Sequence, residues 1–236
     1  MAEERSHGDR LAEALRGEIL GGRYLAGDRL PSERELAARF AVNRLSAREA
    51  LQQLERLGLV EIKRGGARVA ALHDASPDVI AHLFDVGAAP DAALVEQWLD
   101  VSELLFTGAV RFALERASDA EIARSRELLR ALLRAGSGGE DAPYFAALDE
   151  LGELIFAGAR NLVLRLIRNG LKANVLPRLQ GKRARLRPVR AELAELVRAI
   201  DDAVAARDPE RAQEAVRMLW RANRERILKS LRMGAA

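Results

Sequence analysis

Two helical segments separated by only two residues constrain the fold of this chain more than any other feature. The first begins at Ser32, and Glu35, three positions later, can accept a hydrogen bond from the Ser32 amide, which is the pattern of a capping box. The second begins after Asn43, a favoured N-terminal cap, and repeats apolar residues at helical spacing: Ala47, Ala50, Leu51 and Leu54. Because only Ala41 and Val42 connect the two segments, the helices must cross at a steep angle, which predicts a helix-turn-helix.

The elements on either side extend this prediction to a winged helix-turn-helix. The pattern predicts a helix over residues 9–20 that ends at Gly21 and Gly22. Residues 59–72 contain two β-prone runs on either side of Gly65 and Gly66, which predicts a hairpin. The polar stretch 73–78 contains a proline and is interpreted as a linker. We therefore expect a winged helix-turn-helix domain over residues 1–72 and a second domain over residues 79–236.

The second domain is predicted to be an antiparallel bundle of helices. Apolar residues recur with a period of about 3.6, and no strand signal follows residue 79. Short turns separate the expected helices, which favours antiparallel neighbours. The expected ranges are 90–116, 118–135, 141–159, 161–174, 188–206 and 209–231. The predicted fold class is mainly α, with one small β-hairpin in the N-terminal domain.

Composition excludes several classes of function. The sequence has no cysteine, which excludes thiol catalysis and thiolate metal sites. The three histidines, His7, His73 and His82, supply no Ser-His-Asp set, and no glycine-rich phosphate loop is present, so an enzyme is disfavoured. No apolar run approaches the roughly 18 residues of a membrane span, and the N-terminus lacks the apolar stretch of a signal peptide. We expect a cytoplasmic protein that does not bind membranes.

Polar residues at the start of the helix after Asn43 are the candidate DNA contacts. A helix that buries its alanines and leucines is expected to turn Arg44, Ser46 and Arg48 outward at its N-terminus. The major groove accepts one helix, and arginine can bond both acceptors of a guanine edge. The hairpin adds basic residues around a glycine tip, Lys63, Arg64 and Arg68. A solvated helix face, or a winged-helix module that binds a protein, is the alternative, and only DNA binding predicts a steep dependence on salt.

These residues resemble the winged helix-turn-helix of the GntR family of bacterial transcriptional regulators. The resemblance is carried by GRYLAGDRLPSERELAARFAVNRLSAREALQQLERLGLVEIKRGG, residues 22–66. Leu45 departs from the small polar residue common in the family, and either contacts a thymine methyl group or packs inside. The resemblance implies operator DNA as partner and these DNA-contacting positions: Arg34, Asn43, Arg44, Ser46, Arg48, Arg64 and Gly65.

The second domain resembles the FadR subgroup, whose helical bundle dimerises and senses a small molecule. Many relatives hold a divalent metal there with one aspartate and three histidines. In an ungapped comparison Asp149 takes the carboxylate position, while Glu153, Val197 and Leu219 take the imidazole positions. Ser102 falls near an arginine that grips carboxylate ligands in relatives. We therefore expect no zinc-type metal and no cofactor, with a weakly held hard cation on Asp149 and Glu153 as the disfavoured alternative.

An acyl-CoA is one candidate effector, because the acyl-CoA-responsive regulator also lacks the metal histidines. That regulator has a stretch similar to Asn169-Gly170-Leu171-Lys172 of this chain. In this chain, ten Lys or Arg residues and no acidic residue lie between Leu154 and Ala191, and such a run could bind the phosphates of the coenzyme. The same resemblance suggests effector contacts on the last helix at Arg217, Trp220 and Asn223. A small organic acid, or no ligand, is the alternative. The expected protein is a homodimeric regulator, and both repression and activation are compatible with this architecture.

Overall fold

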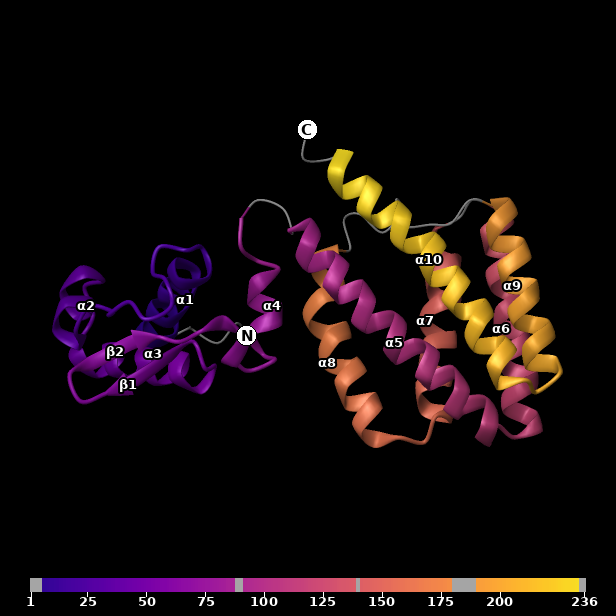
Figure 1. Ribbon diagram of the computed structural model, residues 1–236, viewed down its shortest axis with the longest axis horizontal. Coiled ribbons are helices and arrows are strands. Elements are labelled where there is room, and N and C mark those ends of the chain that lie inside the picture. Colours follow the sequence, from indigo (N-terminus) through magenta and orange to yellow (C-terminus); the bar gives the residue numbers. More distant parts are fainter. Residues whose placement is uncertain (1–5, 88–90, 139–140, 180–189, 234–236) are drawn as a thin grey trace. The chain divides into compact units, whose positions relative to one another are not determined.

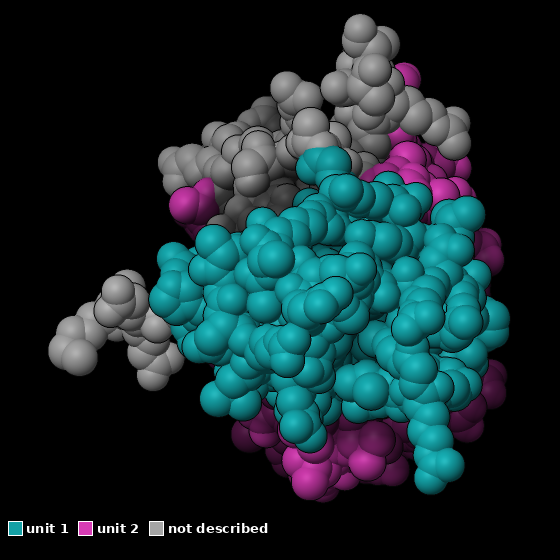
Figure 2. All heavy atoms as spheres, turned by 90° about the vertical axis from the view of Figure 1, so that its left-hand side faces the viewer, with its two compact units in different colours: residues 1–90 teal, residues 91–236 magenta. Residues whose placement is uncertain are grey.

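The computed structural model describes residues 6–87, 91–138, 141–179 and 190–233 of the chain. Their contacts divide the chain into two compact units, Met1–Pro90 and Asp91–Ala236, which are coloured separately in Figure 2. Most described residues are helical, and the described strands form one two-stranded sheet. The mainly α fold class predicted from the sequence is therefore confirmed.

The first unit begins with three helices followed by a hairpin (Figure 1). Side-chain caps fix where the helices begin, because each supplies an acceptor to an otherwise unpaired amide of the first turn. Ser6 and Asp9 form a capping box on α1, and Ser32 and Glu35 form one on α2. Asn43 caps α3. The elements are α1 (His7–Leu20), α2 (Glu33–Arg39), α3 (Arg44–Arg56), β1 (Val60–Lys63) and β2 (Gly66–Val69).

The connection between α2 and α3 is as tight as the sequence requires. Ala41 adopts a left-handed backbone conformation with φ of 52°. The Val42 amide then donates to the Ala37 carbonyl over 3.0 Å, which closes the turn. The two helices and α1 enclose a core of fully buried leucines that includes Leu11, Leu15, Leu36 and Leu54. The helix-turn-helix is thus held by one backbone turn and one apolar core.

The hairpin pairs β1 with β2 in antiparallel register, with Val60 opposite Val69 and Lys63 opposite Gly66. Gly65 and Gly66 have φ of 113° and 120°, a region that side chains rarely allow, so this turn depends on glycine. Val60 and Val69 are buried in the core of the first unit. The base of the wing is therefore rigid, and its tip projects from the core.

Residues 73–78 do not form a free linker. The Ser76 amide donates to the Leu57 carbonyl over 2.9 Å, and Val79 is buried in the core of the first unit. Residues 72–74 form a short 3₁₀ helix, and α4 (Val79–Leu83), which the sequence did not predict, follows. The division between the two compact units falls after Pro90, so α4 groups with the first unit, whereas the sequence placed the start of the second domain at residue 79.

The second unit is a helical bundle, as predicted (Figure 1). Helix α5 packs against α10 and α7, while α6 packs against α7 and α9. Buried residues from these helices form its core, among them Leu129, Leu132, Val197 and Ala212. The helices are α5 (Ala92–Arg116), α6 (Asp119–Gly138), α7 (Asp141–Gly158), α8 (Leu162–Leu179), α9 (Arg190–Ala205) and α10 (Pro209–Met233). Among the described residues, no helix is both long and apolar enough to cross a bilayer.

Candidate DNA-binding surface and effector cavity

Helix α3 presents two arginines on the side away from the core of the first unit. Ala47, Ala50 and Leu54 are fully buried, whereas Arg44 and Arg48 are exposed. The two arginines are four positions apart, so their side chains leave the same face of the helix. Both lie in the N-terminal part of α3, where the helix dipole favours an approaching phosphate. This arrangement fits a helix that enters the major groove with its N-terminus.

The structure corrects the expected orientation of Ser46. Its exposed fraction is only 8%, and its amide donates to Asn43 Oδ1 over 2.7 Å. Ser46 lies three residues after the cap, on the side of α3 that faces α1. Gly8 of α1 approaches so closely that a Cβ added to it would contact the Ser46 carbonyl oxygen. Ser46 thus supports the helix from within. Leu45, in contrast, is 65% exposed, which excludes the packing alternative and leaves its side chain available to an apolar partner.

The exposed arginines differ from their neighbours in having no acidic partner. Arg39 bonds Glu18 from across the helix pair, and Arg23 bonds the same carboxylate over 2.7 Å. Within the part of the chain that the structure describes, Arg44 and Arg48 form no ion pair, nor do Arg34 and Arg64. Arg34 is exposed in the first turn of α2, beside the capping box. These four exposed guanidinium groups are therefore without an ion pair among the described residues, although the charge of Arg34 also acts on Glu35.

The capping box of α2 is electrostatically stabilised. Hydrogen bonds from the Ser32 hydroxyl and amide lower the pKa of Glu35 from its ordinary value, and burial opposes them. Arg34 and Arg29 add a smaller lowering of the Glu35 pKa. The ionised cap holds the start of α2, and with it Arg34, in place.

The wing contributes Arg64 and Gly65 at its tip, as predicted. Lys63 pairs with Glu61, and Arg68 Nη1 donates to the Gly27 carbonyl over 2.9 Å. Of the three basic wing residues, Arg64 alone is free of a protein partner within the described residues. Sequence reasoning missed Arg29, whose backbone forms an isolated antiparallel β-bridge with the backbone of Arg68. The Arg29 side chain lies beside Gly66, where an added Cβ would be 3.3 Å from Arg29 Nε. This contact depends on tertiary folding, so no local pattern indicated it.

The second unit encloses a cavity of about 290 Å³ between its helices. Its wall is largely apolar and includes Phe106 and Phe156, whose rings meet edge-on at 5.0 Å. Both tryptophans of the sequence line it. Six predicted effector residues also line it: Ser102, Asp149, Val197, Leu219, Trp220 and Asn223.

The other three predicted effector residues do not line the cavity. Asn169 is exposed on α8, and Arg217 pairs with Glu214 and lies 3.9 Å from Glu103. Glu153 accepts hydrogen bonds from Arg168 over 2.6 Å and from Lys172 over 2.9 Å. These bonds lower its pKa from the ordinary value, Lys172 most strongly, against an opposing effect of burial. Glu153 is thus an ionised partner of two cations.

The cavity does not fit the metal that many relatives hold. A divalent metal needs converging carboxylates or imidazoles, and Val197 and Leu219 supply only hydrocarbon. Glu153 is neutralised by Arg168 and Lys172, so the pair with Asp149 cannot act as an open cation site. Among the described residues, no group of three or more acidic or histidine side chains is placed to hold a metal ion. The cavity therefore requires a different recognition chemistry.

Two cavity residues were missed by sequence reasoning. Arg168 is 7% exposed and lines the cavity from α8, although in the sequence it belongs to a long basic run. Trp98 lines the cavity from α5, and its buried Nε1 has no hydrogen-bond partner among the described residues. The signal for Arg168 was its four-residue spacing from Leu164, which is also turned inward.

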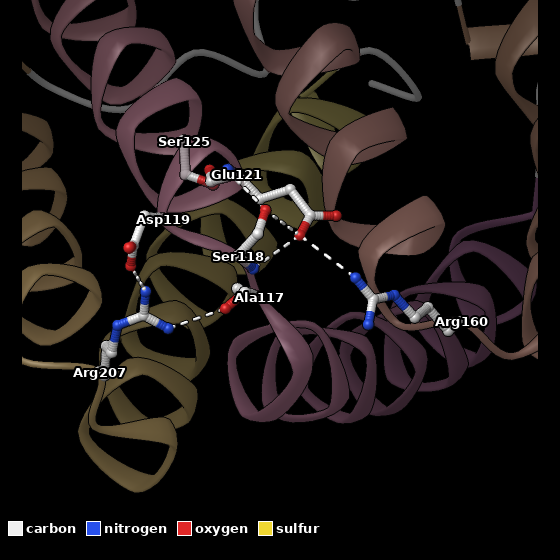
Figure 3. A network of polar contacts seen from close by, with 7 residues as sticks. All are labelled: Ala117, Ser118, Asp119, Glu121, Ser125, Arg160 and Arg207. Carbon is white, nitrogen blue, oxygen red and sulfur yellow. Dashed lines mark hydrogen bonds and ion pairs between the residues drawn. The ribbon is translucent and has the colours of Figure 1, made fainter.

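A polar network fixes the ends of the helices beside the cavity (Figure 3). Ser118 and Glu121 cap α6, with the Ser118 amide donating to Glu121 over 2.8 Å. Arg160, in the turn before α8, lies 3.5 Å from Glu121. Arg207, in the turn before α10, donates to the Ala117 carbonyl over 2.8 Å and pairs with Asp119. The turn before α6 is thereby tied to the turn before α8 through Glu121 and to the turn before α10 through Ala117 and Asp119. Glu121 also lines the cavity.

The fold of the first unit and the matches below define a winged-helix transcriptional regulator with an α-helical second domain. Residues 7–69 match the family model "Bacterial regulatory proteins, gntR family", and residues 97–222 match the FCD domain. The chain therefore belongs to the GntR family of DNA-binding transcriptional regulators and carries an FCD domain.

Known relatives agree with this assignment. The HTH-type transcriptional regulator Mce2R of Mycobacterium tuberculosis is 30% identical over 91% of this chain and 89% of its own length. The galactonate operon transcriptional repressor of Escherichia coli is 28% identical over 66% of this chain and 69% of its own. A solved structure titled for Lar, which controls the agr system of Listeria monocytogenes, has a TM-score of 0.54. It is 16% identical, with 95% of this chain and 97% of that chain covered, and supports the fold alone.

Proposed function

We propose that the protein is a homodimeric, cytoplasmic repressor that binds a pseudo-palindromic operator and responds to a small molecule in the cavity of its second unit. The observation that carries the proposal is a pair of exposed arginines at the capped N-terminus of α3, Arg44 and Arg48, which form no ion pair with any residue that the structure describes. Dimeric regulators of this kind place one such helix in each of two major-groove half-sites.

The residues divide into two kinds of contact. Arg44 and Arg48 would read base edges, since arginine bonds both acceptors of guanine, and exposed Leu45 would meet a thymine methyl group. Arg34 on α2 and Arg64 with Gly65 at the wing tip would contact phosphates, which fix orientation without reading sequence. Asn43 would act through its cap on α3.

An exposed apolar face on α8 supports the dimer. Leu162, Val163, Leu166 and Ile167 are all exposed by more than two fifths of their surface. They recur at positions i, i+1, i+4 and i+5, so they lie on one side of the helix. An operator with two half-sites requires a symmetric second copy, and a contiguous apolar helix face is the kind of surface that such a copy covers.

The cavity supports an effector with a mainly apolar body. Its volume of about 290 Å³ is at the small end of ligand sites, so it could admit an acyl chain but not a whole acyl-CoA. The coenzyme would have to lie outside, against the basic run. Much of that run, from Arg178 to Arg190, has side chains outside the described residues. A small organic molecule without the coenzyme therefore agrees better with the cavity than an acyl-CoA.

Fluorescence anisotropy on the DNA upstream of the protein's own gene tests the proposal. We expect tight binding to that DNA, weak binding to a shuffled duplex of the same composition, and loss of affinity with salt. Each phosphate contact contributes a slope of about 0.9 in log affinity against log salt. Equal affinity for both duplexes, or no dependence on salt, would refute the proposal and favour a protein-interaction module.

A further inference from the structure

A buried cation on the cavity wall is the starting point. Among the described residues, Arg168 is the single charged side chain that is buried. Its guanidinium carbon lies 5.1 Å from the centroid of the Phe156 ring, and its Nη2 would be 3.3 Å from a Cβ on Gly152. Glycine at 152 thus leaves room for the guanidinium beside the cavity. A buried charge is costly unless it is paired, so Arg168 needs an anion.

Its partner in the structure satisfies only part of that need. Glu153 accepts one hydrogen bond from Arg168 Nη1, and within the described residues Arg168 makes no other. A guanidinium has five N–H donors. Glu153 is about half exposed, does not line the cavity, and also holds Lys172. It therefore reaches Arg168 from outside the cavity and leaves donors available within.

Unpaired polar atoms lie at another part of the same cavity. Trp98 Nε1 on α5 and Asn223 Oδ1 on α10 are buried without hydrogen-bond partners among the described residues. Arg224, next to Asn223, donates to Glu96 over 2.6 Å, so the two orphaned atoms lie at the same level of the α5–α10 pair. Buried polar groups in native proteins are nearly always satisfied, by ordered water or by a ligand.

An apolar wall separates these two polar regions. The Phe106 ring contacts Phe156 at 5.0 Å and Trp220 at 5.2 Å, and Phe156 in turn lies under Arg168. Phe106 follows Trp98 by eight residues on α5, which corresponds to about 12 Å along a helix. The cavity therefore offers a buried cation at one part of its wall, apolar rings next to it, and a donor and an acceptor at another part. The wall also carries Lys172 and two carboxylates, Glu121, which is held by Ser118 and Arg160, and Asp149.

We propose that the cavity binds an elongated, mainly apolar molecule with one anionic group, which takes the place of Glu153 on Arg168. A hydroxyl or carbonyl at the far end of this molecule bonds Trp98 and Asn223. Glu153 acts as an internal competitor, since its carboxylate occupies the cation until the ligand arrives. The proposal rests on the proposed function of the cavity as an effector site, and it gives this chain a metal-free way to hold an anion.

Displacement of Glu153 has a structural consequence for α8. The bonds from Arg168 and Lys172 to Glu153 join α8 to α7. When the ligand binds Arg168, only the bond from Lys172 to Glu153 still joins α8 to α7, and Arg168 joins α8 to the ligand. Because α8 also carries the exposed apolar face, occupancy of the cavity would be transmitted to the dimer contact.

Intrinsic fluorescence provides a direct test, since the sequence contains two tryptophans, Trp98 and Trp220, and both line the cavity. The probe is ω-hydroxydecanoate, which has a carboxylate and a hydroxyl at opposite ends, and the comparison compound is the matching neutral diol. We expect a saturable change with the hydroxy acid and at least about tenfold weaker binding of the diol, the effect of one lost charge-assisted bond.

Two substitutions in the cation pair have opposite expected effects. Arg168→Met should weaken binding of the hydroxy acid about tenfold or more. Glu153→Gln should strengthen it, because the competing charge is removed while Arg168 remains. Arg165→Met, an exposed arginine on the same helix, is the matched control and should bind as the wild type does. If Arg168→Met fails to fold, as judged by thermal unfolding, the Glu153→Gln result decides.

The proposal is overturned by no saturable response at millimolar hydroxy acid, by equal binding of the diol, or by weaker binding in Glu153→Gln. Operator binding is measured in parallel without any ligand. Intact operator binding with no ligand response would reject this inference and leave the regulator standing. Ligand binding without operator recognition would reject the proposed regulator function and leave this inference standing.

Discussion

The side-chain oxygen of Asn43 accepts a hydrogen bond from the backbone amide of Ser46 over 2.7 Å, and this bond defines where α3 begins. The cap places Arg44 in the first turn and Arg48 one turn later on the same exposed face. Ser46 is buried between them on the other side. One local contact thus sets the orientation of both proposed base-reading side chains.

Replacing Asn43 with alanine should therefore lower both stability and operator affinity. Loss of an N-cap costs about 1 kcal/mol, because an amide of the first turn loses its acceptor. Chemical denaturation of the full chain measures the first effect and anisotropy the second. Asn43→Ser keeps a capping oxygen and should stay near the wild type. An equal loss of operator affinity in both variants would show that Asn43 contacts DNA directly and does not act only as the cap of α3.

Arg64→Ala should lower the affinity for the operator and for the shuffled duplex by similar factors. The wing tip carries no base-reading group in this account, so the expected change is a salt slope shallower by about 0.9. Lys63→Ala is the matched control, because Lys63 is already paired with Glu61 and should change the slope less. Titration of both duplexes across a salt series gives these slopes. A selective loss on the operator alone would assign Arg64 to base recognition instead.

Leu166→Glu should convert the dimer to a monomer. Leu166 is 59% exposed in the middle of the apolar face of α8, where a partner copy would bury the new carboxylate without a counter-ion. Light scattering reports the mass, and operator affinity should fall with it. Arg165→Glu introduces the same charge on α8 beside that face and should leave a dimer. A dimeric Leu166→Glu protein would exclude α8 as the interface.

The Glu121 cap should make the stability of the second unit depend on pH. Hydrogen bonds from the Ser118 amide and hydroxyl lower the pKa of Glu121, with Arg160 adding to the effect and burial opposing it. Because the folded pKa is below the ordinary value of 4.5, the stabilisation is present above that value and is lost as pH falls through the folded pKa. Glu121→Ala should be less stable than the wild type at neutral pH, and the difference should narrow in acid.

Thermal unfolding at several pH values measures that difference. Glu127→Ala, which removes an exposed carboxylate from the same helix, is the control and should follow the wild type more closely. If the difference in stability between the wild type and Glu121→Ala is constant with pH, the ionised carboxylate of Glu121 does not contribute to the stability of the second unit.

Local chemistry made much of the first unit predictable. Ser32 with Glu35, and Asn43 alone, mark helix starts through bonds between residues three positions apart, which a sequence shows directly. The glycines at 65 and 66 likewise mark a turn that few other residues allow. The burial of Ser46 was not predicted, because it depends on the approach of α1 to one edge of α3.

The cavity was predictable only in part. Six positions inferred from family resemblance do line it, but the role of Glu153 depends on a partner fifteen residues away on another helix. In the sequence Arg168 is one basic residue among many, and its burial against Phe156 and Gly152 of α7 arises only in the folded bundle. Its four-residue spacing from the partly buried Leu164 marks the inner side of α8, but the burial of a charge there is a property of the tertiary structure.

The most direct test of the central claim compares operator discrimination in Arg44→Ala, Arg48→Ala and Arg56→Ala. Arg56 lies in the last turn of the same helix and serves as the matched control. The ratio of affinities for the operator and the shuffled duplex is measured by anisotropy at one fixed salt concentration. The account predicts a fall of about 1–3 kcal/mol in discrimination for the first two variants and none for the third. Unchanged discrimination in both Arg44→Ala and Arg48→Ala would contradict it.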